Sequence, residues 1–246
     1  MRRLLPEPAG DVEIAELERL YDYPGSLVAP FVKVNFVGSA DGASTLDGQS
    51  DGLSSKADKA IFALGRDLAD VIMVGAGTVA IEGYRGVKRT EVRAERRSRL
   101  GRSDVPPIAV VTRSCSIEPT SPLITDTVVP PIVLTCDAAP EDRRIALADA
   151  GADVIVAGDT TVDLAHAVDA LAERDLLRIN CEGGPQLFGE LIAAGLVDEL
   201  CLTVAPLLVS GNASRIAYGL PPVEAQRLRL ASILTEDEFL MLRYTR

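Results

Sequence analysis

The stretch from Arg178 to Val209 constrains the fold of this chain more than any other part of it. It begins within residues 176–181, which have the apolar pattern of a short buried strand, and a Glu-Gly-Gly-Pro sequence follows at 182–185. Apolar side chains then recur at helical spacing, and Pro185 suits the first helical turn because its missing N–H is not needed there. Gly195 suits the end of this helix. The stretch therefore predicts a strand, a glycine turn, a helix and a second strand in succession.

A glycine pair between a strand and a helix N-terminus predicts an anion site. Several backbone N–H groups remain unpaired at such a junction and surround a small concavity, which favours phosphate. The alternative is a plain tight turn, for which one glycine would normally be enough. Because the sequence has two, Gly183 and Gly184, we interpret the junction as a phosphate loop.

Composition narrows the range of partners. Of the 246 residues, 47% are apolar and 25% are charged, as in a globular protein with a sizeable core. The net charge of −11 and the absence of Trp argue against a nucleic-acid partner and against an anionic membrane surface. No apolar run approaches the roughly 18 residues of a membrane span, and the N-terminus does not resemble a signal peptide. We therefore expect a cytoplasmic protein.

Histidine and cysteine content restricts the chemistry. The single histidine, His166, cannot by itself provide a multi-histidine zinc site or a Ser-His-Asp triad, so no metal is expected and His166 is predicted to be structural. The four cysteines form no CxxC pair and are expected to be buried free thiols.

The order of the predicted elements defines the fold class. Strands that alternate with helices imply a mostly parallel sheet with right-handed crossovers; they are expected at 31–37, 71–74, 108–111, 132–134, 154–156 and 176–181. Three further strands have no helix between them, at 199–209, 227–234 and 238–244, so antiparallel strands close one edge. We predict one α/β domain over 1–246, with a mixed, mostly parallel central sheet flanked by helices. Residues 1–28 form an N-terminal extension packed on it.

Four of the predicted strands end in polar or glycine-rich sequence, at Ser39–Gly42, Gly75–Thr78, Thr112–Ser114 and Glu182–Gln186. In open parallel sheets, ligands bind outside the carboxyl ends of the strands. Gly75 and Gly77 lack the third glycine and the following acidic residue of the dinucleotide fingerprint, so a Rossmann fold is not indicated. Two glycine-bearing strand ends still suit an extended ligand with a diphosphate, such as a nicotinamide dinucleotide.

Individual residues at these ends suggest roles. Arg113 and Ser114 are of the kind that recognise a ribose 2′-phosphate, although an ordinary polar loop is the alternative. Asp41 is a candidate acid or substrate partner, although Asp before Gly is also a common turn residue. Glu182 lies at the ligand edge and is a candidate catalytic residue. The basic segment 85–102 is interpreted mostly as a solvated helix or loop, with one or two cations near 85–89 available to a substrate phosphate.

Three stretches carry a resemblance to a known family, NFVGSADG at 35–42, DVIMVGAGTVAIE at 70–82 and CEGGPQLFGELIAAGLVDELCLTVAP at 181–206. The chain resembles the pyrimidine reductases of riboflavin biosynthesis, which are related to the C-terminal domain of the bifunctional deaminase-reductase and have a dihydrofolate reductase-like fold. The resemblance extends from about residue 30 to the end.

The resemblance implies an NADPH-dependent oxidoreductase that reduces the ribose of 5-amino-6-(5-phosphoribosylamino)uracil to ribityl by hydride transfer, and it implies a homodimer. Substrate contacts would fall on Ser50, Arg66 and Glu182, with Asp41 near the reacting centre. Residues 183–188 would hold the cofactor diphosphate. Together with the glycine and arginine positions above, the predicted cofactor-binding set is Gly38, Gly75, Gly77, Thr78, Glu82, Arg113, Ser114, Gly183, Gly184, Pro185, Gln186, Leu187 and Phe188.

The chain departs from the family pattern in two places. The family commonly has a lysine on the first strand and an aromatic residue in the substrate loop, where Asn35 and Gly52 stand here. The zinc deaminase motifs HxE and PCxxC are absent, which predicts a stand-alone reductase. Two alternatives remain open at this point: a dihydrofolate or dihydropterin reductase, and a non-catalytic nucleotide-binding sensor.

The apolar C-terminal strands are expected to form an edge of the sheet that another chain must cover, which agrees with a homodimer.

Overall fold

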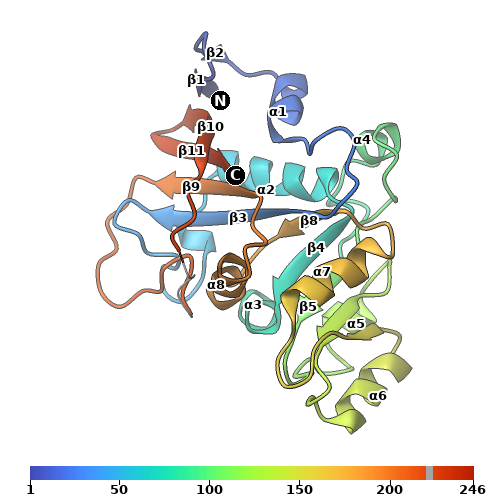
Figure 1. Cartoon of the computed structure of the whole chain (residues 1–246). Helices are drawn as coiled ribbons and strands as arrows, with labels where there is room; N and C mark the ends of the chain where they lie inside the picture. Colours follow the sequence, from blue (N-terminus) through green and yellow to red (C-terminus); the bar gives the residue numbers. More distant parts are fainter. Residues whose placement is uncertain (220–223) are drawn as a thin grey trace.

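One sheet of 11 strands runs through the residues that the computed structural model describes, 1–219 and 224–246 (Figure 1). Its strand order is β2-β1-β10-β11-β9-β3-β8-β4-β5-β6-β7. All neighbours from β9 to β7 are parallel, and the remaining pairs are antiparallel, so the predicted fold class is confirmed. The strands are β1 (Arg2–Leu5), β2 (Gly10–Asp11), β3 (Phe31–Ser39), β4 (Val71–Gly75), β5 (Ile108–Val111), β6 (Ile132–Thr135), β7 (Asp153–Val156), β8 (Arg178–Cys181), β9 (Glu199–Ala205), β10 (Arg229–Glu236) and β11 (Phe239–Thr245).

Helices connect the parallel strands and cover both faces of the sheet. They are α1 (Ile14–Tyr21), α2 (Lys56–Leu68), α3 (Ala76–Glu82), α4 (Ala94–Arg99), α5 (Pro122–Thr125), α6 (Glu141–Asp149), α7 (Leu164–Ala172) and α8 (Pro185–Ala193), with a 3-10 turn η1 at Asp51–Leu53. Ser55 caps α2, because its hydroxyl accepts a hydrogen bond from Asp58 N at 3.1 Å. None of the helices in the described residues is long and apolar enough to cross a membrane.

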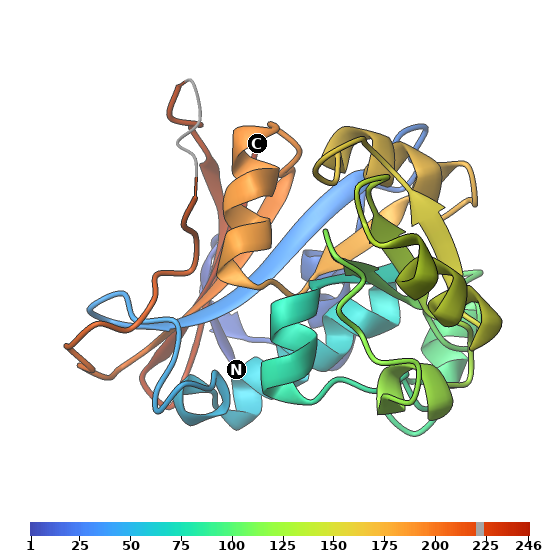
Figure 2. The same ribbon diagram turned by 90° about the horizontal axis from the view of Figure 1, so that it is seen from below.

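The core lies in layers on the two faces of the parallel sheet. On β4, Val71 and Met73 pack with the apolar side chains of α7 and α8, whereas Ile72 and Val74 belong to the cluster on the opposite face. All four side chains are fully buried, as expected for a strand covered on both faces. Figure 2 shows α8 and α2 on opposite sides of β3. The apolar runs of the parallel strands therefore reflect burial on both faces.

The two ends of the chain form the antiparallel edge of the sheet. β9 ends at Ala205 because Pro206 has no N–H for the ladder, so the predicted strand to Val209 was too long. β1 pairs with β10 and β2 pairs with β1, so the N-terminal extension contributes strands that the sequence analysis did not predict. The short sequence of β1, Arg-Arg-Leu-Leu, lacks the alternation that would have indicated a strand.

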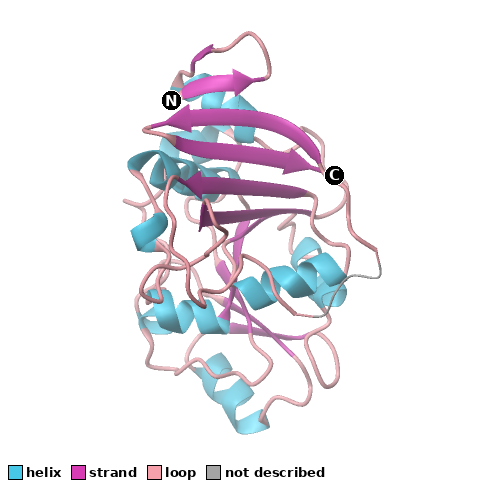
Figure 3. Cartoon of the chain, turned by 90° about the vertical axis from the view of Figure 1, so that its left-hand side faces the viewer, coloured by secondary structure: helices cyan, strands magenta, loops and turns pink. Residues whose placement is uncertain are grey.

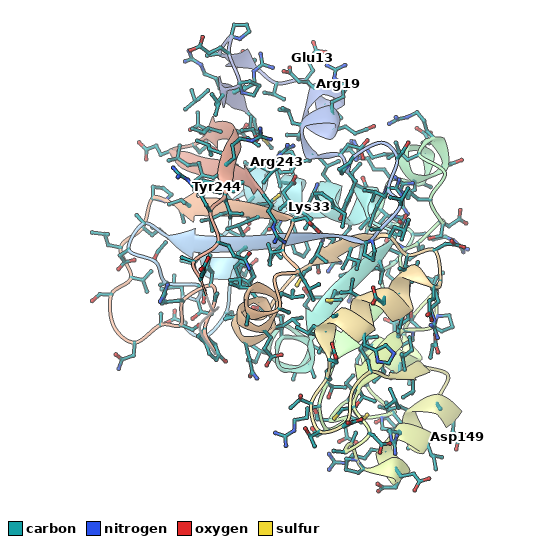
Figure 4. All side chains as sticks on the ribbon, viewed as in Figure 1. Glu13, Arg19, Lys33, Asp149, Arg243 and Tyr244 are labelled. Atoms are coloured by element: carbon teal, nitrogen blue, oxygen red, sulfur yellow. The ribbon has the colours of Figure 1, made fainter. Side chains whose placement is uncertain are left out.

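A buried ionic cluster fixes the junction between the parallel and antiparallel parts. Lys33 Nζ on β3 lies 3.1 Å from Glu199 Oε1 on β9, and both residues are buried. Arg243 on β11 lies 3.6 Å from the other carboxylate oxygen of Glu199 (Figure 4). Because a buried charge is costly without a partner, this cluster specifies the pairing of three strands.

Two arginines of the basic segment are buried rather than solvated. Arg97 is fully buried, and its Nη1 donates to the carbonyl oxygens of Arg66 at 2.9 Å and Ala69 at 2.8 Å, at the C-terminus of α2. Arg96 pairs with Asp67 and lies 2.8 Å from Glu18. These two arginines are exceptions in a segment that was interpreted as mostly solvated, because they satisfy the carbonyls and carboxylates at the end of α2.

The cysteines behave as predicted. Cys115, Cys136, Cys181 and Cys201 are all free and buried. Burial raises the pKa of the Cys181 thiol to about 12, so this thiol stays protonated. Buried protonated thiols act as small apolar groups in the core.

Candidate active site

The four polar strand ends meet at one edge of the sheet. β3, β8, β4 and β5 are consecutive in the strand order and run parallel, so their carboxyl ends lie together. Gly75 N donates to Gly183 O at 2.8 Å, and Glu182 N donates to Met73 O at 2.9 Å. The two glycine-bearing junctions are therefore in direct contact, as a single extended ligand requires.

A side chain would not fit at Gly183 or at Gly184, for a different reason at each position. They are joined by a cis peptide bond. Gly183 has φ +87°, which favours glycine, and a Cβ there would lie 2.8 Å from Phe36 Cζ. Gly184 has φ −80° and ψ −173°, which any residue adopts, but a Cβ there would collide with the hydroxyl of Thr78. The junction is therefore packed closely against α3.

Helix α8 begins and ends as predicted. Pro185 occupies its first turn, and Gly195 beyond its end has φ +68°. The side chains of Leu187 and Phe188 are buried in the core, and Phe188 stacks on Phe36 with ring centroids 5.2 Å apart. The Gln186 amide instead bonds to Glu190 on the exposed side of the helix, Nε2 to Oε1 at 3.0 Å. The side chains of residues 186–188 are thus used elsewhere, so the predicted contacts of these residues with a cofactor diphosphate would have to come from their backbone groups.

A cavity of about 760 Å³ opens beside these junctions. Its wall includes seven of the predicted site residues, namely Ser50, Arg66, Thr78, Glu82, Glu182, Gly184 and Pro185. They come from the loop before η1 and from α2, α3, the end of β8 and the start of α8. The predicted residues Gly38, Asp41, Gly75, Gly77, Arg113, Ser114, Gly183 and 186–188 do not line it. The cavity therefore brings together the predicted substrate-binding residues and part of the predicted cofactor set.

Glu182 is the centre of the polar network in this cavity. Its carboxylate accepts hydrogen bonds from Arg66 Nε at 2.8 Å and Arg66 Nη2 at 2.7 Å, a bidentate pair. Tyr84 Oη donates to it at 2.8 Å, and Asn180 Nδ2 donates at 3.2 Å. Burial alone would lower the pKa of Arg66, but the charge and hydrogen bonds of Glu182 outweigh burial and raise it. Glu182 and Arg66 are therefore a charged pair with a fixed orientation.

Aromatic rings hold the guanidinium of Arg66 in place. Its Cζ lies 4.7 Å from the ring centroid of Phe62 and 5.7 Å from that of Tyr84. Burial and the neighbouring Glu182 raise the pKa of Tyr84 well above its usual value, which keeps its hydroxyl a donor. At the residue before Arg66, a Cβ at Gly65 would lie 3.0 Å from Asn180 Oδ1, so glycine lets α2 approach β8. The helix carrying Arg66 is thereby positioned over the strand that leads to Glu182.

Two other predicted residues contact each other. Ser50 donates to Glu82 Oε1 from its N at 3.1 Å and from its Oγ at 3.0 Å. This contact joins the loop before η1 to the end of α3 across the cavity wall. The predicted substrate-binding and cofactor-binding surfaces therefore share a border at Ser50 and Glu82.

Asp41 lies outside the cavity and joins two loops. Its carboxylate accepts from the N of Val209 and from the N of Ser210, the latter at 2.7 Å, and also bonds the hydroxyl of Ser39. These hydrogen bonds, that of Ser39 first, lower the pKa of Asp41 to about 2. Ser44 also bonds Ser214 farther along the second loop, from its N to O at 2.8 Å. These contacts join the turn at Asp41 to the loop that follows β9, and the catalytic role of Asp41 stays a prediction.

Arg113 and Ser114 are exposed just beyond β5. Arg143 from α6 donates to Ser114 O, Nη1 to O at 3.3 Å. The strand end therefore carries two arginines from different elements, which the sequence order did not indicate. Gly77 is also exposed, in α3, and Gly38 near the end of β3 lies under Ala43 and Ile216.

Several residues on the cavity wall were not predicted. They include Lys59, Phe62, Tyr84, Glu91 and Tyr218, with Asn180 directly behind Glu182. Arg85 also lines the wall, and it belongs to the segment 85–89 in which one or two cations were expected to be available to a substrate. Phe62 lies one helical turn before Arg66 on the same face of α2, so helical periodicity was a usable signal for it. Tyr84 and Glu91 lie in an irregular loop whose path the sequence pattern does not reveal.

The fold is that of an α/β protein with a dihydrofolate reductase-like sheet, and the chain's named relatives are reductases. Residues 30–242 match the model of the RibD C-terminal domain family, and the chain belongs to this family. The family membership that the sequence resemblance indicated is thereby confirmed.

Similar proteins agree with this family. The chain is 31% identical over 187 residues to the 2,5-diamino-6-ribosylamino-4(3H)-pyrimidinone 5′-phosphate reductase of Archaeoglobus fulgidus, over 75% of this chain and 84% of the relative. It is 29% identical to the Methanothermobacter thermautotrophicus protein of the same name, over 88% of this chain and 98% of that one. A pyrimidine reductase-like protein from Corynebacterium diphtheriae superposes with a TM-score of 0.80 at 28% identity, covering 93% and 97% of the two chains.

Proposed function

We propose that this protein is an NADPH-dependent reductase of riboflavin biosynthesis that acts on a phosphorylated ribosylaminopyrimidine. The observation that carries the proposal is the buried Glu182–Arg66–Tyr84 network in a cavity that borders two touching glycine junctions. The names of the relatives agree with it, since they are reductases of a ribosylaminopyrimidinone phosphate.

The chain's own residues fit a nicotinamide dinucleotide. Side chains are excluded at Gly183 and Gly184, so backbone can approach a diphosphate closely there. Thr78 and Glu82 border the same cavity. The exposed guanidinium groups of Arg113 and Arg143 suit a ribose 2′-phosphate, which is the basis for NADPH over NADH. The cofactor supplies hydride when bound, and the protein supplies position and charge.

The cavity wall favours a diamino pyrimidinone over the predicted uracil. Apart from the Glu182–Arg66 pair, its charged residues are four carboxylates, Asp51, Asp58, Glu82 and Glu91, against two cations, Lys59 and Arg85. Carboxylates accept hydrogen bonds from an exocyclic amino group, whereas a carbonyl in the same position needs a donor. We therefore propose 2,5-diamino-6-ribosylamino-4(3H)-pyrimidinone 5′-phosphate as the better substrate and 5-amino-6-(5-phosphoribosylamino)uracil as the poorer one.

The network at Glu182 positions the substrate rather than supplying a proton. The carboxylate already accepts four hydrogen bonds, and its side chain is inaccessible to solvent. A group held in this way orients its neighbours with little reorganisation. Glu182→Gln would break the bidentate pair while keeping the size of the side chain, and we expect it to reduce kcat/KM.

The test is oxidation of NADPH, followed by absorbance, with each candidate substrate and with dihydrofolate. Turnover of either pyrimidine and none of dihydrofolate supports the proposal. Turnover of dihydrofolate alone would replace it by the pterin alternative, and binding of NADPH without oxidation in any mixture would favour a sensor.

We also propose a homodimer through the outer face of the C-terminal strands. Leu240, Leu242 and Tyr244 on β11 lie opposite Val204, Leu202 and Leu200 on β9 and are only partly covered. Their neighbours Met241 and Cys201 point to the other face and are buried. Figure 3 shows the antiparallel strands beside the termini with this face toward the viewer and no helix across it. A row of partly exposed apolar side chains on a sheet suits a second copy of the chain.

A further inference from the structure

The outer side of Arg66 faces a second carboxylate, that of Glu91. Arg66 Nη1 lies 3.5 Å from Glu91 Oε2, and Arg85 Nη2 lies 3.4 Å from Glu91 Oε1. All three residues line the cavity. Glu91 therefore stands between two guanidinium groups, with one oxygen toward each.

These two contacts are weak compared with the contacts of Glu182. The Arg66–Glu182 distances are 2.7 and 2.8 Å, whereas both Glu91 distances are near the outer limit of a hydrogen bond. The side chain of Glu91 is 30% exposed and that of Arg85 is 59% exposed. The exposed Arg85–Glu91 pair contributes little to stability, and the Arg66–Glu91 contact is long at 3.5 Å, so breaking them costs little.

The backbone of Glu91 is held by its neighbours, whereas its carboxylate makes only the two long contacts. Glu91 N donates to Lys88 O at 2.9 Å, and the next residue, Val92, is buried. Arg93 N then donates to Asp67 Oδ1 at 2.8 Å, on α2. The carboxylate can therefore turn toward solvent while the segment that carries it stays in place.

We infer that Glu91 is a built-in competitor for the phosphate of the substrate. A phosphate monoester carries several acceptor oxygens, so it can bond two guanidinium groups at once, as the two oxygens of Glu91 do here. When such a ligand enters, it displaces Glu91 from Arg66 and Arg85, and the carboxylate moves to solvent. Glu91 thereby lowers the affinity for smaller anions and makes occupancy depend on a ligand that also fills the rest of the cavity. This inference rests on the proposed function and adds a specificity-determining residue to it.

The test compares Glu91→Gln with a matched control, Glu95→Gln. Glu95 is exposed on α4 in the same segment and makes no hydrogen bond or ion pair among the described residues, so the control removes the same charge without the contact. Binding of inorganic phosphate is measured by calorimetry, and unfolding is measured to confirm that both variants fold. We expect Glu91→Gln to bind phosphate about tenfold more tightly than wild type, and Glu95→Gln to bind it as wild type does. Equal affinity of Glu91→Gln and wild type would overturn the inference.

Kinetics separate this inference from the proposed function. The ratio of kcat/KM for the phosphorylated pyrimidine to that for its dephosphorylated nucleoside should rise about tenfold in Glu91→Gln, and the rise should disappear when Arg85→Ala is added. An unchanged ratio in an active enzyme would overturn the role of Glu91 and leave the proposed function intact. Absence of turnover in wild type would instead remove the proposed function. The phosphate affinities of Glu91→Gln and wild type would still show whether Glu91 competes with phosphate for Arg66 and Arg85.

Discussion

Replacement of Gly184 by alanine tests the phosphate loop most directly. The backbone of Gly184 is extended, so alanine is allowed there, but the new methyl group collides with the hydroxyl of Thr78. Overpacking of this kind costs about 1–3 kcal/mol. We expect Gly184→Ala to lower the free energy of unfolding by that amount in urea titrations without cofactor.

A double variant identifies the cause of the loss. Thr78 Cβ lies 3.8 Å from the position of the new methyl group, an ordinary contact, so Thr78→Ala removes the collision. On its own, Thr78→Ala exchanges a half-buried threonine for a better helix former and should change stability by about 0.5 kcal/mol or less. The double variant should therefore recover most of the lost stability, with a coupling energy of about 1–3 kcal/mol. A double variant as unstable as Gly184→Ala would refute the collision.

Cofactor affinity gives the second readout. If a diphosphate packs against Gly184, the methyl group still fills that space in the stable double variant. Its NADPH affinity should be at least about tenfold weaker than that of Thr78→Ala, which is about 1.4 kcal/mol. Equal affinity of the two would refute the phosphate loop. Gly183→Ala is the matched control for folding, because its positive φ and its contact with Phe36 destabilise it whatever stands at Thr78.

Three further predictions concern the network, the cofactor and the dimer. Tyr84→Phe should cost about 1.5–3 kcal/mol, the range for a hydrogen bond to a charged group, in urea unfolding at neutral pH. Because the folded-state pKa of Tyr84 is raised, its contribution is fully present below pH 10 and is lost as the pH rises above that; a variant whose unfolding free energy falls as steeply above pH 10 as that of wild type would contradict this. Arg113→Ala and Arg143→Ala should each reduce the preference for NADPH over NADH about tenfold in fluorescence titrations, and an unchanged preference in both would remove the proposed 2′-phosphate site. Leu242→Lys should convert a dimer to a monomer in light scattering, and a monomeric wild type would end the dimer proposal.

The sequence revealed the local parts of the fold well. Pro185, the glycine pair and Gly195 predicted α8 and its junction because each acts through the backbone of its own neighbours. The parallel sheet followed from strand and helix alternation. The antiparallel pairing of β1 with β10 did not follow, because it joins the two ends of the chain and no local pattern encodes such a contact.

The site was predicted only in part, for the same reason. Glu182 was predicted from its place at the sheet edge and Arg66 from the family resemblance, but their bidentate contact joins residues far apart in sequence and required the fold. The segment 85–102 was interpreted as mostly solvated, and nothing in its sequence singled out Arg97 as buried. Its burial depends on the unpaired carbonyls at the end of α2, which only the packing of α4 brings to it.

The strand order also bears on how the chain reaches its native state. β3 lies in the interior of the sheet, yet its neighbours β8 and β9 both come from much later in the sequence. During folding this apolar strand therefore has two open edges until most of the chain has become available. Pairings between such distant segments form slowly, because the entropy of closing a long loop is lost before the contacts are gained. We expect slow refolding with a tendency to aggregate at high protein concentration, and a benefit from chaperones that shield the open edges of β3.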